Sequence, residues 1–61
     1  MTQEQVMNRA TANGYGKEAA AKRIDELTAY ALDNCGVRLP DAKRIALDWF
    51  DEELADFEFI A

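Results

Sequence analysis

The chain has 61 residues, of which 49% are hydrophobic, and a formal net charge of −5. This length suits one small domain, and the hydrophobic fraction is that of a folded chain rather than a disordered one. Cys35 is the only cysteine and histidine is absent, which excludes an internal disulfide and an ordinary four-ligand zinc site. The apolar runs are too short to span a bilayer, and the first residues lack the regions of a signal peptide. We therefore expect residues 1–61 to form a single cytoplasmic domain.

The first predicted helix covers residues 2–12. Thr2 and Gln5 fit a capping box, in which the threonine hydroxyl accepts the Gln5 amide and the glutamine side chain reaches back. The pair Asn13-Gly14 follows, and it readily takes the left-handed conformation that ends a helix. The apolar stripe of this helix is narrow and consists of Val6, Met7 and Ala10.

The second predicted helix covers residues 17–35, and Gly36 fits the left-handed position after its last turn. Hydrophobic residues recur at helical spacing, and further residues widen the same face. Cys35 belongs to this face, so we expect a small buried side chain rather than a reactive thiol. The spaced residues are Ala20, Ile24, Leu27 and Ala31, and those that widen the face are Ala21, Thr28, Leu32 and Cys35.

The third predicted helix covers residues 40–57 and begins at Pro40 or Asp41, because both residue types favour a first helical turn. Its hydrophobic residues fall on one broad arc, and Glu53 is a carboxylate inside that arc. Residues 57–61 fit either a helical tail or a short extended arm. The arc consists of Ala42, Ile45, Ala46, Trp49, Phe50, Leu54 and Phe57. Three helices joined by short loops predict an all-α fold, a small three-helix bundle.

Residue types that commonly carry catalysis are scarce in this chain. There is no histidine, and Cys35 has no imidazole to activate it. A bundle of this length also leaves little concave space for a substrate. We therefore expect a protein that is not an enzyme and that holds no cofactor or metal.

The negative charge is concentrated in the last third of the sequence. Residues 39–61 hold seven of the twelve acidic residues but two of the seven basic ones. An exposed aromatic strip with a carboxylate rim suits a basic protein surface, because the aromatics act as anchors and the charges steer the encounter. This expectation requires that no arginine or lysine from elsewhere in the chain neutralises the carboxylates. The expected partner-binding residues are Asp48, Asp51, Glu52, Asp56, Glu58 and Phe59.

These features predict a small acidic interaction module that binds or inhibits a larger basic protein, such as one that handles nucleic acid. A sharper form is a nucleic-acid mimic, by analogy of size and charge alone with small acidic proteins of mobile elements. One alternative is a helix-turn-helix-like DNA-binding regulator, because Ala10, Gly14 and Ala20 have a similar spacing, although the net charge disfavours direct binding to nucleic acid. The other alternative is a homodimer in which a second copy covers the surplus aromatics.

Overall fold

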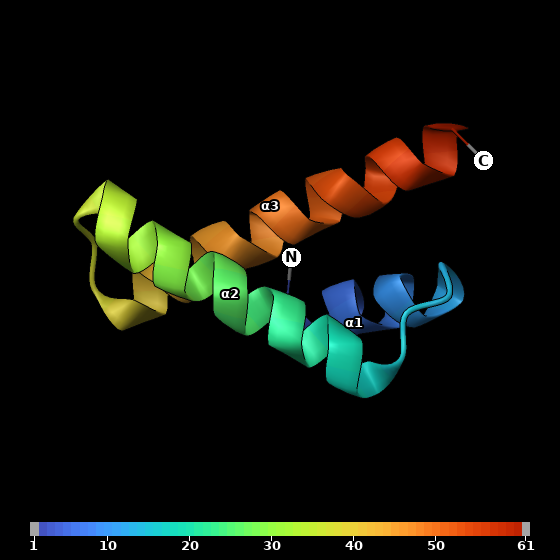
Figure 1. Cartoon of the computed structure of the whole chain (residues 1–61), viewed down its shortest axis with the longest axis horizontal. Helices are drawn as coiled ribbons and strands as arrows, with labels where there is room; N and C mark the ends of the chain where they lie inside the picture. The colour runs from blue at the N-terminus through green and yellow to red at the C-terminus, as the bar shows by residue number, and fades with distance from the viewer. Residues whose placement is uncertain (1, 61) are drawn as a thin grey trace.

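The computed structural model describes the backbone of residues 2–60 and the side chains of residues 2–56. Three helices follow one another along the chain: α1 (Gln3–Ala12), α2 (Lys17–Cys35) and α3 (Leu39–Ile60) (Figure 1). The predicted all-α three-helix bundle is confirmed, and the predicted bounds agree within one residue except at the end of α3. There the backbone stays helical to Ile60, so the chain forms the helical tail rather than the extended arm. Within this described part of the chain, no helix combines the length and apolar character that crossing a membrane requires.

Hydrogen bonds fix both ends of α1. The Gln5 amide donates to the Thr2 hydroxyl at 3.2 Å and the Thr2 amide donates to Gln5 Oε1 at 3.0 Å, which is the predicted capping box. At the other end, the Tyr15 amide donates to the Ala10 carbonyl oxygen at 3.0 Å, and Gly14 has a φ of 94°. Glycine adopts this left-handed conformation without the clash that a Cβ would cause, so Gly14 turns the chain from α1 toward α2.

A short turn joins α2 to α3. Gly36 follows α2 with a φ of 63°, in the left-handed region, as the sequence predicts. α3 begins one residue before the predicted start, because the Ala42 amide donates to the Arg38 carbonyl oxygen at 2.9 Å and brings Leu39 into the first turn. Pro40 is then the second helical residue. Its missing N–H removes no bond there, since the first amides of a helix have no intrahelical acceptor.

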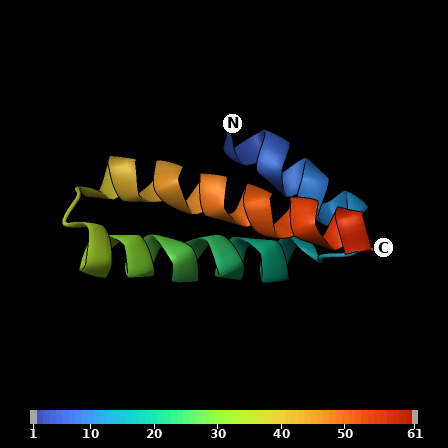
Figure 2. The same ribbon diagram turned by 90° about the horizontal axis from the view of Figure 1, so that it is seen from above.

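The helices α2 and α3 are antiparallel neighbours, and α1 contacts both of them. Figure 2 shows α2 and α3 side by side along their length, with α1 packed at the end away from their turn. In Figure 1 α3 crosses behind α2 near the turn, and the two helices separate toward the end where α1 lies. Side-chain size changes along this pair of helices, because the fully buried Ala31, Ala42 and Ala46 lie near the turn. The larger core residues lie toward the open end.

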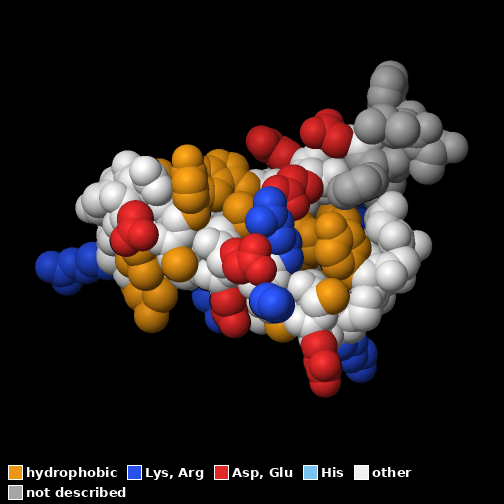
Figure 3. Space-filling model, in the orientation of Figure 1, with side chains coloured by type: hydrophobic (Ala, Val, Ile, Leu, Met, Phe, Trp, Pro, Cys, Tyr) orange, Lys and Arg blue, Asp and Glu red, His pale blue; other side chains and the backbone are white. Residues whose placement is uncertain are grey.

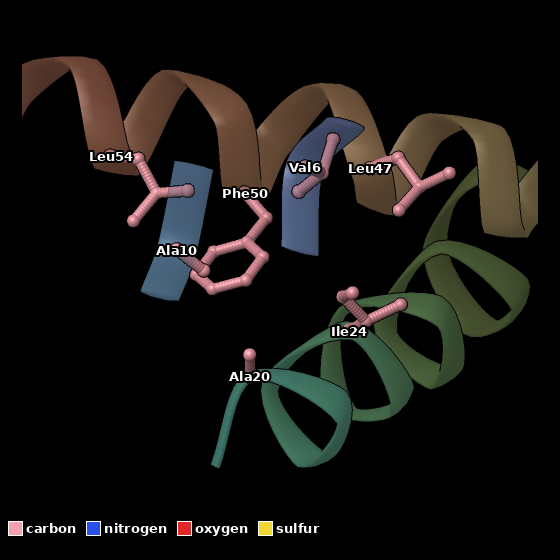
Figure 4. Packing of buried hydrophobic residues seen from close by; sticks show 7 residues of the cluster. All are labelled: Val6, Ala10, Ala20, Ile24, Leu47, Phe50 and Leu54. Atoms are coloured by element: carbon pink, nitrogen blue, oxygen red, sulfur yellow. The ribbon is translucent and has the colours of Figure 1, made fainter. Parts of the chain in front are cut away.

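One hydrophobic cluster holds the three helices together, and Figure 4 shows its side chains converging. Phe50 is fully buried, and the Tyr15 ring packs edge-on against it with the ring centroids 5.3 Å apart. Phe50 is the largest fully buried side chain, and burying a phenylalanine stabilises a fold by about 1.5–3 kcal/mol. The buried members are Val6, Ala10, Ala20, Ile24, Leu47, Phe50 and Leu54.

The buried face of α2 is narrower than the sequence predicts. Cys35 is exposed, so the expectation of a buried thiol is wrong, and Ala21 and Leu32 are exposed as well. α1 has ten residues and covers the open end of the α2–α3 hairpin, so it does not reach the last turns of α2 (Figure 2). Thr28 is buried as expected, and its hydroxyl donates to the Ile24 carbonyl oxygen at 2.7 Å.

The buried face of α3 is rotated relative to the predicted arc. Leu47, which the arc omitted, is 6% exposed and belongs to the core. Trp49 is half-buried rather than enclosed, and the Glu53 position lies at the boundary between core and solvent. This rotation leaves Trp49 and Glu53 on the flank of α3 that faces α2.

Candidate functional site

A groove lies between α2 and α3. Its volume is about 360 Å³, near the small end of the range for ligand pockets. Figure 3 shows hydrophobic side chains exposed where the two helices run side by side, with carboxylates beside them along α3. We call this site the acidic-aromatic groove; its apolar floor is Leu27, Tyr30 and Trp49, and its acidic rim is Glu52, Glu53 and Asp56.

Helical spacing brings the lining residues together. Leu27 and Tyr30 are one turn apart on α2, and the α3 residues follow Trp49 at the i+3, i+4 and i+7 positions. Side chains at these intervals share one face of a helix. Because α2 and α3 are antiparallel neighbours, the two faces meet and form opposite walls of the groove.

The floor of the groove contains an aromatic pair. The Tyr30 and Trp49 rings meet edge to face, with centroids 5.8 Å apart and an interplanar angle of 69°. Tyr30 is 60% exposed, the same fraction as Leu39, which makes it one of the two most exposed large hydrophobic residues described. In an edge-to-face pair each ring keeps at least one face that its partner does not occupy. Because Tyr30 is largely exposed, its ring remains accessible to a ligand while it packs against Trp49.

One carboxylate of the rim is already bound by an arginine of the same chain. Arg23 on α2 donates from Nε to Glu53 Oε2 at 3.1 Å and from Nη2 to Glu53 Oε1, and it also contacts Glu26 at 3.4 Å. The hydrogen bond to Glu53 raises the pKa of Arg23 above its ordinary value. This bidentate pair explains why a carboxylate is tolerated inside the predicted apolar arc, because a cation from the neighbouring helix satisfies it.

A second cross-helix ion pair lies on the other flank of α3. Arg9 of α1 donates from Nη1 to Asp51 Oδ1 at 2.8 Å, and both side chains are less than one-third exposed. Asp51 therefore connects α3 to α1 and does not line the groove. The sequence-based expectation that no cation from elsewhere reaches the carboxylates of this helix is thus not met at Asp51 or at Glu53.

The structure separates the six predicted partner-binding residues. Glu52 and Asp56 line the groove, and Asp48 is exposed four residues before Glu52. Among the described residues, none of these three carboxylates forms an ion pair. The side chains of Glu58 and Phe59 lie outside the described residues.

The sequence-based prediction missed the α2 wall of the groove. Tyr30 lies outside the predicted hydrophobic face of α2 and Glu53 lies inside the predicted arc of α3, yet the predicted site contains neither residue. The Glu53 position was a usable signal, since a carboxylate within a buried face requires a partner on the next helix. The pairing of the α2 and α3 faces could not be read from either helix alone.

The chemistry available in the groove is recognition by ring faces, aliphatic surface and carboxylates. Within the described part of the chain, no three carboxylate or thiol side chains converge closely enough to hold a metal ion. No family model matches this chain, and comparisons with curated proteins and with solved structures give no match. The function is therefore argued from the groove.

Proposed function

We propose that this protein is a small helical interaction module that binds a basic surface of a partner protein through the acidic-aromatic groove. The observation that carries the proposal is the pairing of an exposed aromatic floor with two rim carboxylates, Glu52 and Asp56, that are not neutralised within the described residues. Aromatic anchors supply most of the binding energy at protein interfaces, and complementary charges raise the rate of encounter and reject wrong partners.

A binding role fits the groove better than a catalytic one. Glu52 and Asp56 are exposed to solvent, whereas carboxylates that act as acids or bases are usually tuned by burial. Cys35 is exposed and unpaired, which suits a reducing compartment, and we propose a cytoplasmic location on that basis.

The spacing of carboxylates on α3 gives less support to close mimicry of a nucleic acid. Asp48, Glu52 and Asp56 follow one another at intervals of four residues, or about 6 Å along the helix axis. One strand of DNA places a phosphate about every 3.4 Å. The row therefore carries roughly half the linear charge density of a DNA strand, so we base the proposal on the groove and not on the charge row.

The exposed surface of α2 also bears on direct DNA binding. Its exposed charged side chains are Lys17, Glu18, Lys22, Asp25, Glu26 and Asp33. Carboxylates outnumber amines two to one in this set, which would repel a phosphate backbone. We therefore do not propose the helix-turn-helix alternative.

The proposal is tested by charge reversal in the groove and at a matched control site. The rim variant carries Glu52→Lys and Asp56→Lys, and the control variant carries Glu18→Lys and Asp25→Lys on a face of α2 that points away from Leu27. Both variants change the net charge by the same amount. Partners are first trapped by a photo-crosslinker placed at Asp48 and identified, and binding of the purified partner is then measured at low and high salt.

We expect a basic partner whose binding is lost in the rim variant, weakened by salt, and retained in the control variant. Equal binding of both variants would show that the groove is not the interface. Loss in both variants would show a general charge effect rather than a site. Circular dichroism of each variant establishes that the helices are intact before binding is compared.

A further inference from the structure

We infer that the acidic-aromatic groove is built to receive an arginine side chain from the partner, with the guanidinium held by Glu52 and Asp56 and the aliphatic stem lying on Tyr30 and Trp49. This inference rests on the proposed function and specifies which side chain the groove recognises.

The arrangement of the rim carboxylates favours a forked donor. Glu52 and Asp56 are at i and i+4 on α3, where Cβ atoms lie about 5–6 Å apart on one helix face. A guanidinium carries five N–H donors in a planar fork and can donate to two carboxylates at once, whereas an ammonium is a compact point charge. The spacing of the two carboxylates therefore suits arginine better than lysine.

The molecule already contains one example of this recognition. Arg23 reaches Glu53 from α2 and donates to both of its carboxylate oxygens, with its side chain 37% exposed at the edge of the groove. A guanidinium is thus accommodated in bidentate geometry at this rim. Because Arg23 occupies Glu53, the charge left for a ligand is that of Glu52 and Asp56.

The floor adds a second preference for arginine. A guanidinium or its stem can lie against the rings of Trp49 and Tyr30, which both line the groove, and cation–π contacts involve arginine more often than lysine. Leu27 extends the apolar surface on the α2 side. A hydrophobic residue next to the arginine in the partner would cover Leu27, so the preferred ligand is an arginine with an apolar neighbour.

Charge decides between the classes of occupant. Anionic ligands such as phosphates and acidic lipids are repelled by the rim. A second copy of this chain could present Arg38 or Arg44, which are exposed, but it carries a net charge of −5 of its own. A basic partner segment meets no such repulsion, and we assign the groove to it.

The experiment uses the full chain and two synthetic peptides that differ at one position. Both contain a leucine beside the test residue, which is arginine in one peptide and lysine in the other. Binding is followed by titration calorimetry, and the site by amide chemical shifts and by the fluorescence of Trp49, the single tryptophan. The variants are Trp49→Leu, the rim pair Glu52→Gln with Asp56→Asn, and the control pair Glu18→Gln with Asp25→Asn.

We expect the arginine peptide to bind roughly two- to fivefold more tightly than the lysine peptide, the value of a cation–π contact at an exposed site. The double substitution of the rim, Glu52→Gln with Asp56→Asn, should weaken binding of the arginine peptide by about tenfold, as expected for the loss of two exposed charge pairs. Trp49→Leu should reduce the preference for arginine while helicity is kept, and the control pair should change neither the preference nor the affinity.

The outcomes separate this inference from the proposed function. If both peptides bind equally tightly and the rim substitutions weaken the binding of both, the arginine preference is overturned and the proposed function stands. Absence of shifts at the groove with either peptide, together with partner binding that the rim variant does not affect, would overturn both. Self-association that Arg38→Gln with Arg44→Gln abolishes would assign the groove to a second copy and overturn the inference.

Discussion

Replacing Phe50 by alanine tests whether one side chain holds the three helices together. Phe50 is fully buried in the cluster formed by α1, α2 and α3, with Tyr15 edge-on against its ring. Truncating a buried phenylalanine costs about 3–5 kcal/mol, because the transfer energy is lost and a cavity remains. The whole chain of 61 residues has roughly 3–9 kcal/mol available, at about 0.05–0.15 kcal/mol per residue. Phe50→Ala should therefore remove a third or more of the stability.

The measurement is urea denaturation followed by circular dichroism and by the fluorescence of Trp49. A loss of about 3 kcal/mol also predicts a fall in melting temperature of roughly 12 °C or more for a domain of this size. Phe50→Leu keeps most of the volume and should cost about 1–2 kcal/mol. Leu39→Ala is the surface control, because Leu39 is 60% exposed, and it should change stability by no more than about 0.5 kcal/mol. Equal midpoints for Phe50→Ala and Leu39→Ala would refute the packing described above.

Three further changes test other features of the fold. Arg23→Gln breaks the pair with Glu53 and should lower the unfolding free energy by about 0.2–1 kcal/mol, since both groups are about one-third exposed. This loss of stability should shrink at high salt, and a loss that does not depend on salt would contradict an ionic origin. Gly36→Ala should lower the unfolding free energy measured in urea by about 1–2 kcal/mol because φ is 63°, and Gly36→Asn should lower it less. No atom lies within 4 Å of an added Cβ, so a larger loss would contradict the open surroundings of Gly36. Cys35 should react with a thiol reagent in the native protein as quickly as in urea, and protection that disappears only on unfolding would contradict its exposure.

Local signals in the sequence were sufficient to predict where the three helices begin and end, apart from the end of α3. The helix boundaries are marked by short-range chemistry that each segment carries by itself: the capping box of Thr2 and Gln5, and the glycines Gly14 and Gly36 at the turns. Helical spacing also identified most of the core. Leu47 was missed because the rotation of α3 depends on what the other two helices present to it.

The candidate site was less predictable because it is a product of two helices. Glu52 and Asp56 line the groove, but Asp51 could not be separated from them without the position of Arg9. Residues on facing helices have no fixed spacing in sequence, so a charge pair between α1 and α3 leaves no local pattern. For the same reason, the sequence did not show that Tyr30 on α2 lines the groove beside Trp49 on α3.

The crossing of α2 and α3 near their turn has a consequence for how this protein could change over evolution. Ala31, Ala42 and Ala46 are fully buried near the turn. A larger side chain at any of these three positions would push α2 and α3 apart. The width of the groove, and with it the size of the side chain that fits, therefore depends in part on three alanine side chains that do not line it.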